Sequence, residues 1–207
     1  TGLLAPESSL LDLACGDGSF LREALQTGAG RVVGVELSEE GVLRCVAAGL
    51  AVYQGDITEG LADYRDGSFA CVSLIRTVEL LDRPEPVLRE MLRVGRTGLL
   101  TFNNFGHWRH RLRYLLTGQV PTFISPDRDL GGPPTRLSYP LFRRYCRKSG
   151  IRIVRRIPLP AHPSARAFPS LFAHELAVML ERLPAPPQGT GDGGIGRMRP
   201  GRAKIAR

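Results

Sequence analysis

The chain has 207 residues, of which 43% are hydrophobic and 23% charged, a composition typical of globular domains. No apolar run approaches the roughly 20 residues of a membrane-spanning helix, and no segment resembles a signal peptide. We therefore expect a cytoplasmic protein with no membrane association, although the chain begins at Thr1 rather than Met. The 4 cysteines form no CxxC pair, which favours reduced thiols over disulfides and gives no metal site.

The formal net charge of +8 is unevenly distributed. Residues 184–207 carry half of it, with Asp192 as their single acidic residue, and they are rich in Pro and Gly. This composition predicts one domain over residues 1–183 and a disordered basic tail over 184–207. A solvated tail accounts for the excess charge, so we do not expect nucleic acid as a partner.

The first third of the chain alternates between short apolar runs and amphipathic segments. Residues 10–13 predict a buried strand, and residues 15–18 predict a Gly-containing turn. Ser19 is expected to cap the helix that follows. A second strand is predicted at 31–36, with Ser38 as the N-cap of the next helix.

The same alternation continues through the middle of the chain. Further strands are predicted at 51–54, 70–75 and 98–102, with a helix that starts at Pro86 before the last of them. This regularity predicts an α/β fold with a doubly wound, mostly parallel sheet.

The last third has a different pattern. Residues 108–116 and 139–149 predict basic amphipathic helices separated by a Pro/Gly-rich stretch at 120–135, and 151–157 predict a strand. Residues 173–182 fit an antiparallel strand, which we prefer, or a helix. The apolar faces that we expect to pack inward comprise Trp108, Leu112, Leu115 and Leu116 in one helix, and Leu141, Phe142, Tyr145 and Cys146 in the other. For the arginine-rich faces, solvation is the first interpretation, protein docking the second and RNA binding the third.

The turn after the first strand carries the main functional signal. Gly16 and Gly18 allow positive φ and let a ligand approach the backbone. Glu36 ends the second strand, where a carboxylate can accept both hydroxyls of an adenosine ribose. Asp56 follows the third strand, where it can accept the exocyclic amine of adenine. Each acid alone could simply cap a turn, but the combination predicts a nucleoside-type ligand.

The ligand is predicted to be S-adenosylmethionine (SAM) or S-adenosylhomocysteine rather than NAD. Position 21 is Leu, so the third glycine of a GxGxxG dinucleotide motif is absent. Asp12 and Asp17 would repel a pyrophosphate, whereas they favour the ammonium and sulfonium groups of SAM.

The sequence assigns no catalytic residue. After the fourth predicted strand, Glu79 could act as a base and Arg76 could hold an anionic substrate, but we prefer a helix-surface ion pair for both. His107 could be a base or a structural histidine packed beside Trp108. No (D/N)PPY motif is present, which disfavours methylation of nucleic-acid adenines.

Three segments resemble the MetW family of methionine biosynthesis proteins: LLDLACGDGSFL at 10–21, residues 32–72, and residues 87–121. The segment from Phe102 to Leu112 (FNNFGHWRHRL) narrows the resemblance to MetW, since the glycine-containing motif is common to all class I SAM-dependent methyltransferases. The chain departs from the family at Ala14, where glycine is usual, at Asn103, where proline is usual, and over residues 122–138.

The resemblance implies a class I methyltransferase fold with a single seven-stranded domain. It also implies a role in methionine biosynthesis as a partner or activator of a homoserine O-acyltransferase. The alternatives are a SAM-dependent methyltransferase acting on a small molecule and an RNA methyltransferase. The residues expected to hold the cofactor are Asp12, Gly16, Gly18, Glu36, Leu37, Asp56 and Ile57.

Overall fold

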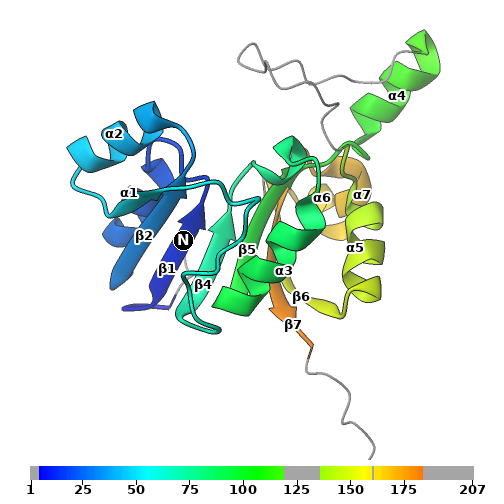
Figure 1. Ribbon diagram of the computed structural model, residues 1–207. Helices are drawn as coiled ribbons and strands as arrows, with labels where there is room; N and C mark the ends of the chain where they lie inside the picture. Colours follow the sequence, from blue (N-terminus) through cyan, green and yellow to red (C-terminus); the bar gives the residue numbers. More distant parts are fainter. Residues whose placement is uncertain (1–4, 119–135, 160, 184–207) are drawn as a thin grey trace, which may run out of the picture.

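The computed structural model describes residues 5–118, 136–159 and 161–183, which form one α/β domain around a seven-stranded sheet of order β3-β2-β1-β4-β5-β7-β6 (Figure 1). The strands are β1 (Ser9–Leu13), β2 (Arg31–Glu36), β3 (Val52–Gln54), β4 (Phe69–Leu74), β5 (Gly95–Asn103), β6 (Ile151–Leu159) and β7 (Glu175–Arg182). Strands β1 to β5 pair in parallel, whereas β7 runs antiparallel to β5 and to β6. The prediction of a mostly parallel sheet is confirmed.

The helices connect the strands and cover both faces of the sheet. They are α1 (Ser19–Gln26), α2 (Glu39–Ala47), α3 (Pro84–Val94), α4 (Trp108–Thr117), α5 (Tyr139–Lys148), α6 (Pro163–Ala167), α7 (Pro169–Phe172) and the 3₁₀ turn η1 (Val78–Leu80). The sequence did not predict η1, α6 or α7, which are too short to show a helical period. The third helix begins at Pro84, two residues before the predicted Pro86, because prolines are accepted throughout the first turn.

Two apolar layers hold the sheet between its helices. Leu11 and Val33 belong to the core on the side of α3 and α5, whereas Leu10 and Val32 belong to the core on the side of α1 and α2. Neighbouring residues of a strand point to opposite faces, so an unbroken apolar run fills both layers. Figure 1 shows α3 and α5 in front of β4, β5, β7 and β6, with α1 and α2 at the β1–β2 end.

Of the two predicted helix caps, one is confirmed. The Ser38 Oγ accepts a hydrogen bond of 3.0 Å from the Gly41 N–H at the start of α2. Ser19 is not a cap, because α1 begins at Ser19 itself and its N-cap residue is Gly18. Instead, the Asp17 Oδ1 accepts the Ser19 N–H at 3.0 Å. The side chain that bonds the first backbone N–H of α1 is therefore Asp17, and not Ser19 as predicted.

The last predicted strand is confirmed as β7, which inserts antiparallel between β5 and β6. Leu176, Val178 and Leu180 are each completely buried in the layer of α3 and α5. Their spacing of two residues is the period of a strand, which decides against the helical alternative.

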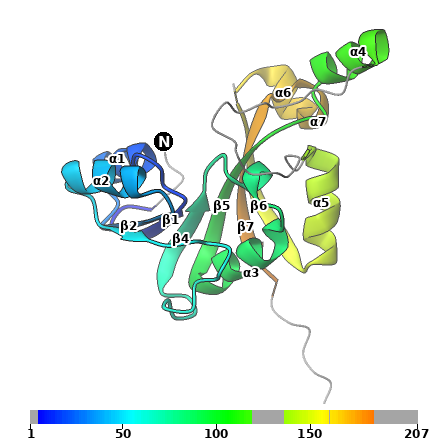
Figure 2. The same cartoon turned by 45° about the horizontal axis from the view of Figure 1, so that its top comes forward.

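Two predictions of inward packing are wrong. No residue of α4 is buried against the described part of the chain, and α4 extends away from the sheet in both views (Figures 1 and 2). Leu115 and Leu116 are 79% and 74% exposed. In α5, Phe142 and Cys146 are buried as predicted, but Leu141 is 41% exposed. Amphipathic spacing identifies an apolar face without showing whether anything covers it.

The Pro/Gly-rich stretch at 120–135 and the basic tail at 184–207 lie outside the described residues. Within the described ranges, no helix has the length and apolarity needed to cross a membrane. All four cysteines are free and buried.

Candidate functional site

The glycine-containing turn lies between the carboxyl end of β1 and the start of α1, and its backbone is left-handed at three positions. Ala14, Gly16 and Gly18 have φ values of 55°, 58° and 72°. A Cβ on Gly18 would lie 2.3 Å from Leu50 Cδ1, so only glycine fits there. A Cβ on Gly16 would meet nothing within 4 Å. The turn is therefore tightly packed on the side where Gly18 would carry a Cβ, and open on the side where Gly16 would carry one.

Glu36 holds this turn against the end of β2. Its Oε2 accepts the Gly16 N–H at 2.8 Å, and its Oε1 accepts the Ser38 N–H at 2.9 Å. Gly41 leaves room for the carboxylate, since a Cβ there would lie 2.7 Å from Glu36 Cγ. The carboxylate thus joins the Gly16 amide of the turn to the start of α2, as its place at the end of β2 predicts.

A cavity of about 660 Å³ opens beside the turn, at the carboxyl ends of β1, β2 and β3. Ala14, Leu37, Asp56 and Ile57 line it on one side. The Asp56 Oδ1 accepts bonds from the Thr58 N–H at 2.8 Å and from the Thr58 Oγ at 2.7 Å. These bonds fix the carboxylate through one oxygen and leave Oδ2 for a donor on a ligand. The structure thus brings Leu37, Asp56 and Ile57 to one cavity.

Asp12 is 2% exposed within the sheet. Its Oδ1 accepts a 2.6 Å hydrogen bond from the Ser73 Oγ on the neighbouring strand β4. Burial raises the pKa of Asp12 to about 7; the Ser73 bond opposes the shift and the negative charge of Glu36 adds to it. Ser73 is not among the predicted site residues, although a serine within the apolar run of β4 is itself an indication of a polar contact.

A second group of charged residues lies where β4, β5 and β7 meet. Arg76 forms a two-pronged ion pair with Glu175, with Nε–Oε1 and Nη2–Oε2 distances of 3.0 and 2.9 Å. Glu79 is not on the surface as expected: it is 6% exposed. Its Oε1 accepts the Asn103 N–H, and its Oε2 has no hydrogen-bond partner. Burial raises the pKa of Glu79.

His107 takes a structural position. Its Nδ1 accepts the Arg109 N–H at 3.2 Å as the N-cap of α4, and its ring stacks on His174 with centroids 3.8 Å apart. Burial lowers the pKa of His107 to about 4, with further contributions from His174, His110 and Arg109. A ring with so low a pKa is a weak base near neutral pH. This geometry favours the structural interpretation over the catalytic one.

The fold and this arrangement of loop, acids and cavity define a protein of the class I SAM-dependent methyltransferase fold. Solved structures agree: a methyltransferase from Mesorhizobium loti has a TM-score of 0.61 at 16% identity, over 86% of this chain and 92% of the other. The [4+2]-cyclase SpnF has the same TM-score of 0.61 at 15% identity, over 88% and 78%. Such low identities show the fold alone, and the cyclase shows that the fold also serves other reactions.

The sequence profile of the family described as "Methionine biosynthesis protein MetW" matches residues 1–177, and the chain belongs to this family. A relative in Rhodopirellula baltica, the bifunctional methionine biosynthesis protein MetXA/MetW, is 34% identical over 122 residues. That alignment covers 55% of this chain and 20% of the relative, so this chain corresponds to about a fifth of that longer protein.

Proposed function

We propose that this MetW protein binds SAM or S-adenosylhomocysteine in the cavity beside the glycine turn and acts as the partner of a homoserine O-acyltransferase in the cytoplasm. The observation that carries the cofactor proposal is that Glu36 accepts the Gly16 N–H of the turn, while Asp56 lines the cavity beside the turn together with Leu37 and Ile57. The family membership and the fused MetXA/MetW relative support the acyltransferase partnership.

The residues present fit this cofactor. Glu36 would accept the ribose hydroxyls, while Asp56 would accept the adenine amine, with Leu37 and Ile57 along the ring. The missing Cβ atom of Gly16 leaves space for the rest of the cofactor. When bound, SAM supplies an activated methyl group and two positive charges. Asp12 is the buried acid whose ionised form those charges would stabilise.

A second candidate is methyl transfer from SAM to a small acceptor. The observation that favours it is Glu79, a buried carboxylate with one unpaired oxygen at the carboxyl ends of β4 and β5. Ligands of open α/β sheets bind at these ends, and a carboxylate with a raised pKa is suited to accept a proton from a hydroxyl or ammonium acceptor. The neighbouring Arg76–Glu175 pair would orient a charged acceptor.

The deciding experiment measures the activity of the same organism's homoserine O-acyltransferase with and without the full chain, across a SAM titration. We expect the acyltransferase activity to rise or fall when the chain is added, and we expect the two proteins to co-purify. Methyl transfer from labelled SAM is measured in parallel with small amines, alcohols and carboxylates. An unaffected acyltransferase with no co-purification, together with a methylated product that Glu79→Gln abolishes, would replace the first candidate by the second.

A further inference from the structure

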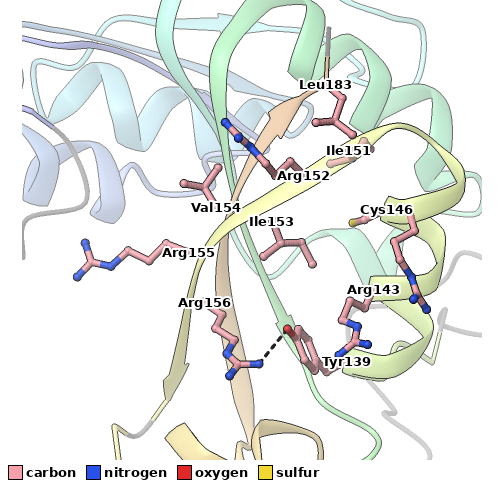
Figure 3. A pocket seen from close by; sticks show the side chains of 11 residues that line it. Tyr139, Arg143, Cys146, Ile151, Arg152, Ile153, Val154, Arg155, Arg156 and Leu183 are labelled. Carbon is pink, nitrogen blue, oxygen red and sulfur yellow. Dashed lines mark hydrogen bonds between the residues drawn. The ribbon is translucent and has the colours of Figure 1, made fainter. Parts of the chain in front are cut away.

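A groove with a basic rim lies at the edge of the sheet opposite β3, far from the glycine turn. It has a volume of about 590 Å³ and runs between α5 and β6 (Figure 3). Its floor is apolar and includes Cys146, Ile151 and Ile153. Figure 3 shows Tyr139 and Arg143 of α5 facing the strand across this floor.

The rim has an unusual excess of positive charge. Seven Arg and Lys residues occur between positions 143 and 156, and no acidic residue occurs among them. Arg156 is engaged within the groove, because its guanidinium stacks over the Tyr139 ring at 5.9 Å. Arg152 pairs with Glu181 of β7. Arg143 and Arg147 are exposed, and neither has an ion-pair partner among the described residues.

Strand β6, which forms one wall of the groove, is an edge strand of the sheet. Residues 151–159 pair with β7 on one side, and no described segment pairs with them on the other. An edge strand presents backbone donors and acceptors that a further strand can use. The pairing shifts by one residue between Ile153 and Arg155, so the edge is twisted locally but continues on both sides of the shift.

We propose that this groove binds an acidic segment of a partner protein, which adds to the edge of β6 as an extra strand. Backbone pairing with β6 would supply the affinity. On the face of the added strand toward α5, apolar side chains would enter the floor, and acidic side chains at other positions of the same face would reach Arg143 and Arg147. This combination selects for an extended peptide that carries apolar and acidic residues on the same face of the strand.

Charge argues against two other occupants. The residues after Leu183, which lines one end of the groove, carry five basic side chains and only Asp192 as an acid. A second copy of the chain would bring the same arginines against each other. Nucleic acid would satisfy the arginines but would make no use of an apolar floor or a strand edge. The groove is separate from the cavity beside the glycine turn, and its proposed use does not depend on the acyltransferase partnership.

The test uses the full chain and a fluorescein-labelled peptide of ten residues, with Ser at every second position and with Val and Glu in turn at the positions between, so that Val and Glu share one face of the strand. We expect saturable binding by fluorescence anisotropy that weakens as salt increases. Arg143→Glu/Arg147→Glu should weaken binding at least tenfold. The matched control Arg44→Glu/Arg65→Glu makes the same charge change on exposed residues of α2 and the loop before β4, and should change binding less than twofold.

A second peptide arm needs no protein variant and so does not depend on the folding of one. N-methylation of every second backbone amide removes the N–H donors along one edge of the extended peptide and leaves its charge unchanged. That edge can then no longer pair with a strand. Two peptides are compared, each methylated along a different edge. The one methylated along the edge that pairs with β6 should bind at least tenfold more weakly than the other. Equal binding of both forms, no binding of the parent peptide, or tighter binding of an oligouridylate that the Arg143→Glu/Arg147→Glu change abolishes would each overturn the proposal.

Discussion

The buried Asp12 makes the stability of the protein depend on pH in a way that one substitution should remove. In the folded chain the pKa of this carboxyl is raised to about 7, whereas in an unfolded chain an aspartate titrates near 3.9. Between these values the folded protein holds a proton that the unfolded chain has released. The free energy of unfolding therefore falls as pH rises from about 4 to about 7.

The size of the effect follows from the two pKa values. From pH 5 to pH 8, linkage gives a loss of about 2–3 kcal/mol from this single group. Asp12→Asn keeps the shape of the side chain and an oxygen for the 2.6 Å bond from Ser73, but it does not titrate. The variant should therefore lack this part of the pH dependence and be more stable than the parent at pH 8.

Urea unfolding of both proteins at half-unit steps from pH 5 to pH 8 measures this difference, and the other titrating groups cancel in it. Ser73→Ala is a useful companion, because the Ser73 bond opposes the shift of the Asp12 pKa. Its loss should move the transition to higher pH. Parallel stability profiles for the parent and Asp12→Asn would refute the assignment of a raised pKa to this carboxyl.

Three further predictions concern the turn, the cavity and the tail. Glu36→Ala should weaken SAM binding by about 1–3 kcal/mol in calorimetry, since charged hydrogen bonds are lost, and an unchanged affinity would remove Glu36 from the site. Ala14→Gly should raise the free energy of unfolding by up to about 1 kcal/mol, because alanine is strained at a φ of 55°; a decrease would contradict this. Deletion of residues 184–207 should leave the melting temperature unchanged, and a clear fall would show that the tail contributes to the core.

The parallel half of the sheet could be predicted because its signals are local. Strands β1, β2, β4 and β5 each contain a short apolar run, whereas β3 is a short and partly exposed strand, and βα alternation then fixes the order of the layers. The same rule brings Glu36 and Asp56 to one edge, although they are far apart along the chain. The positions of these residues could be predicted for this reason, because they follow strand ends rather than any long-range pairing, whereas their role in binding a cofactor stays a prediction.

The remaining features depend on contacts that leave no local pattern. Arg76 meets Glu175 only because β7 returns beside β5, 99 residues later. The burial of Glu79 could not be predicted, because its short segment shows no hydrophobic periodicity that would assign the residue to a buried face. The amphipathic spacing of α4 likewise indicates an apolar face, but it does not show whether that face is covered.

Two buried carboxyl groups separate the two candidate functions. Asp12 lies beside the turn, where a bound cofactor's positive charge would favour its ionised form, so of these two carboxyl groups a chain that only senses SAM needs Asp12 and not Glu79. Glu79 is buried at the carboxyl ends of β4 and β5, where it would act on an acceptor under the second candidate function and has no proposed role in holding the adenosine. Asp12→Asn should therefore change SAM affinity under either function. Glu79→Gln should change methyl transfer only if the protein is an enzyme, and it should leave SAM affinity and any effect on the acyltransferase intact if it is a sensor.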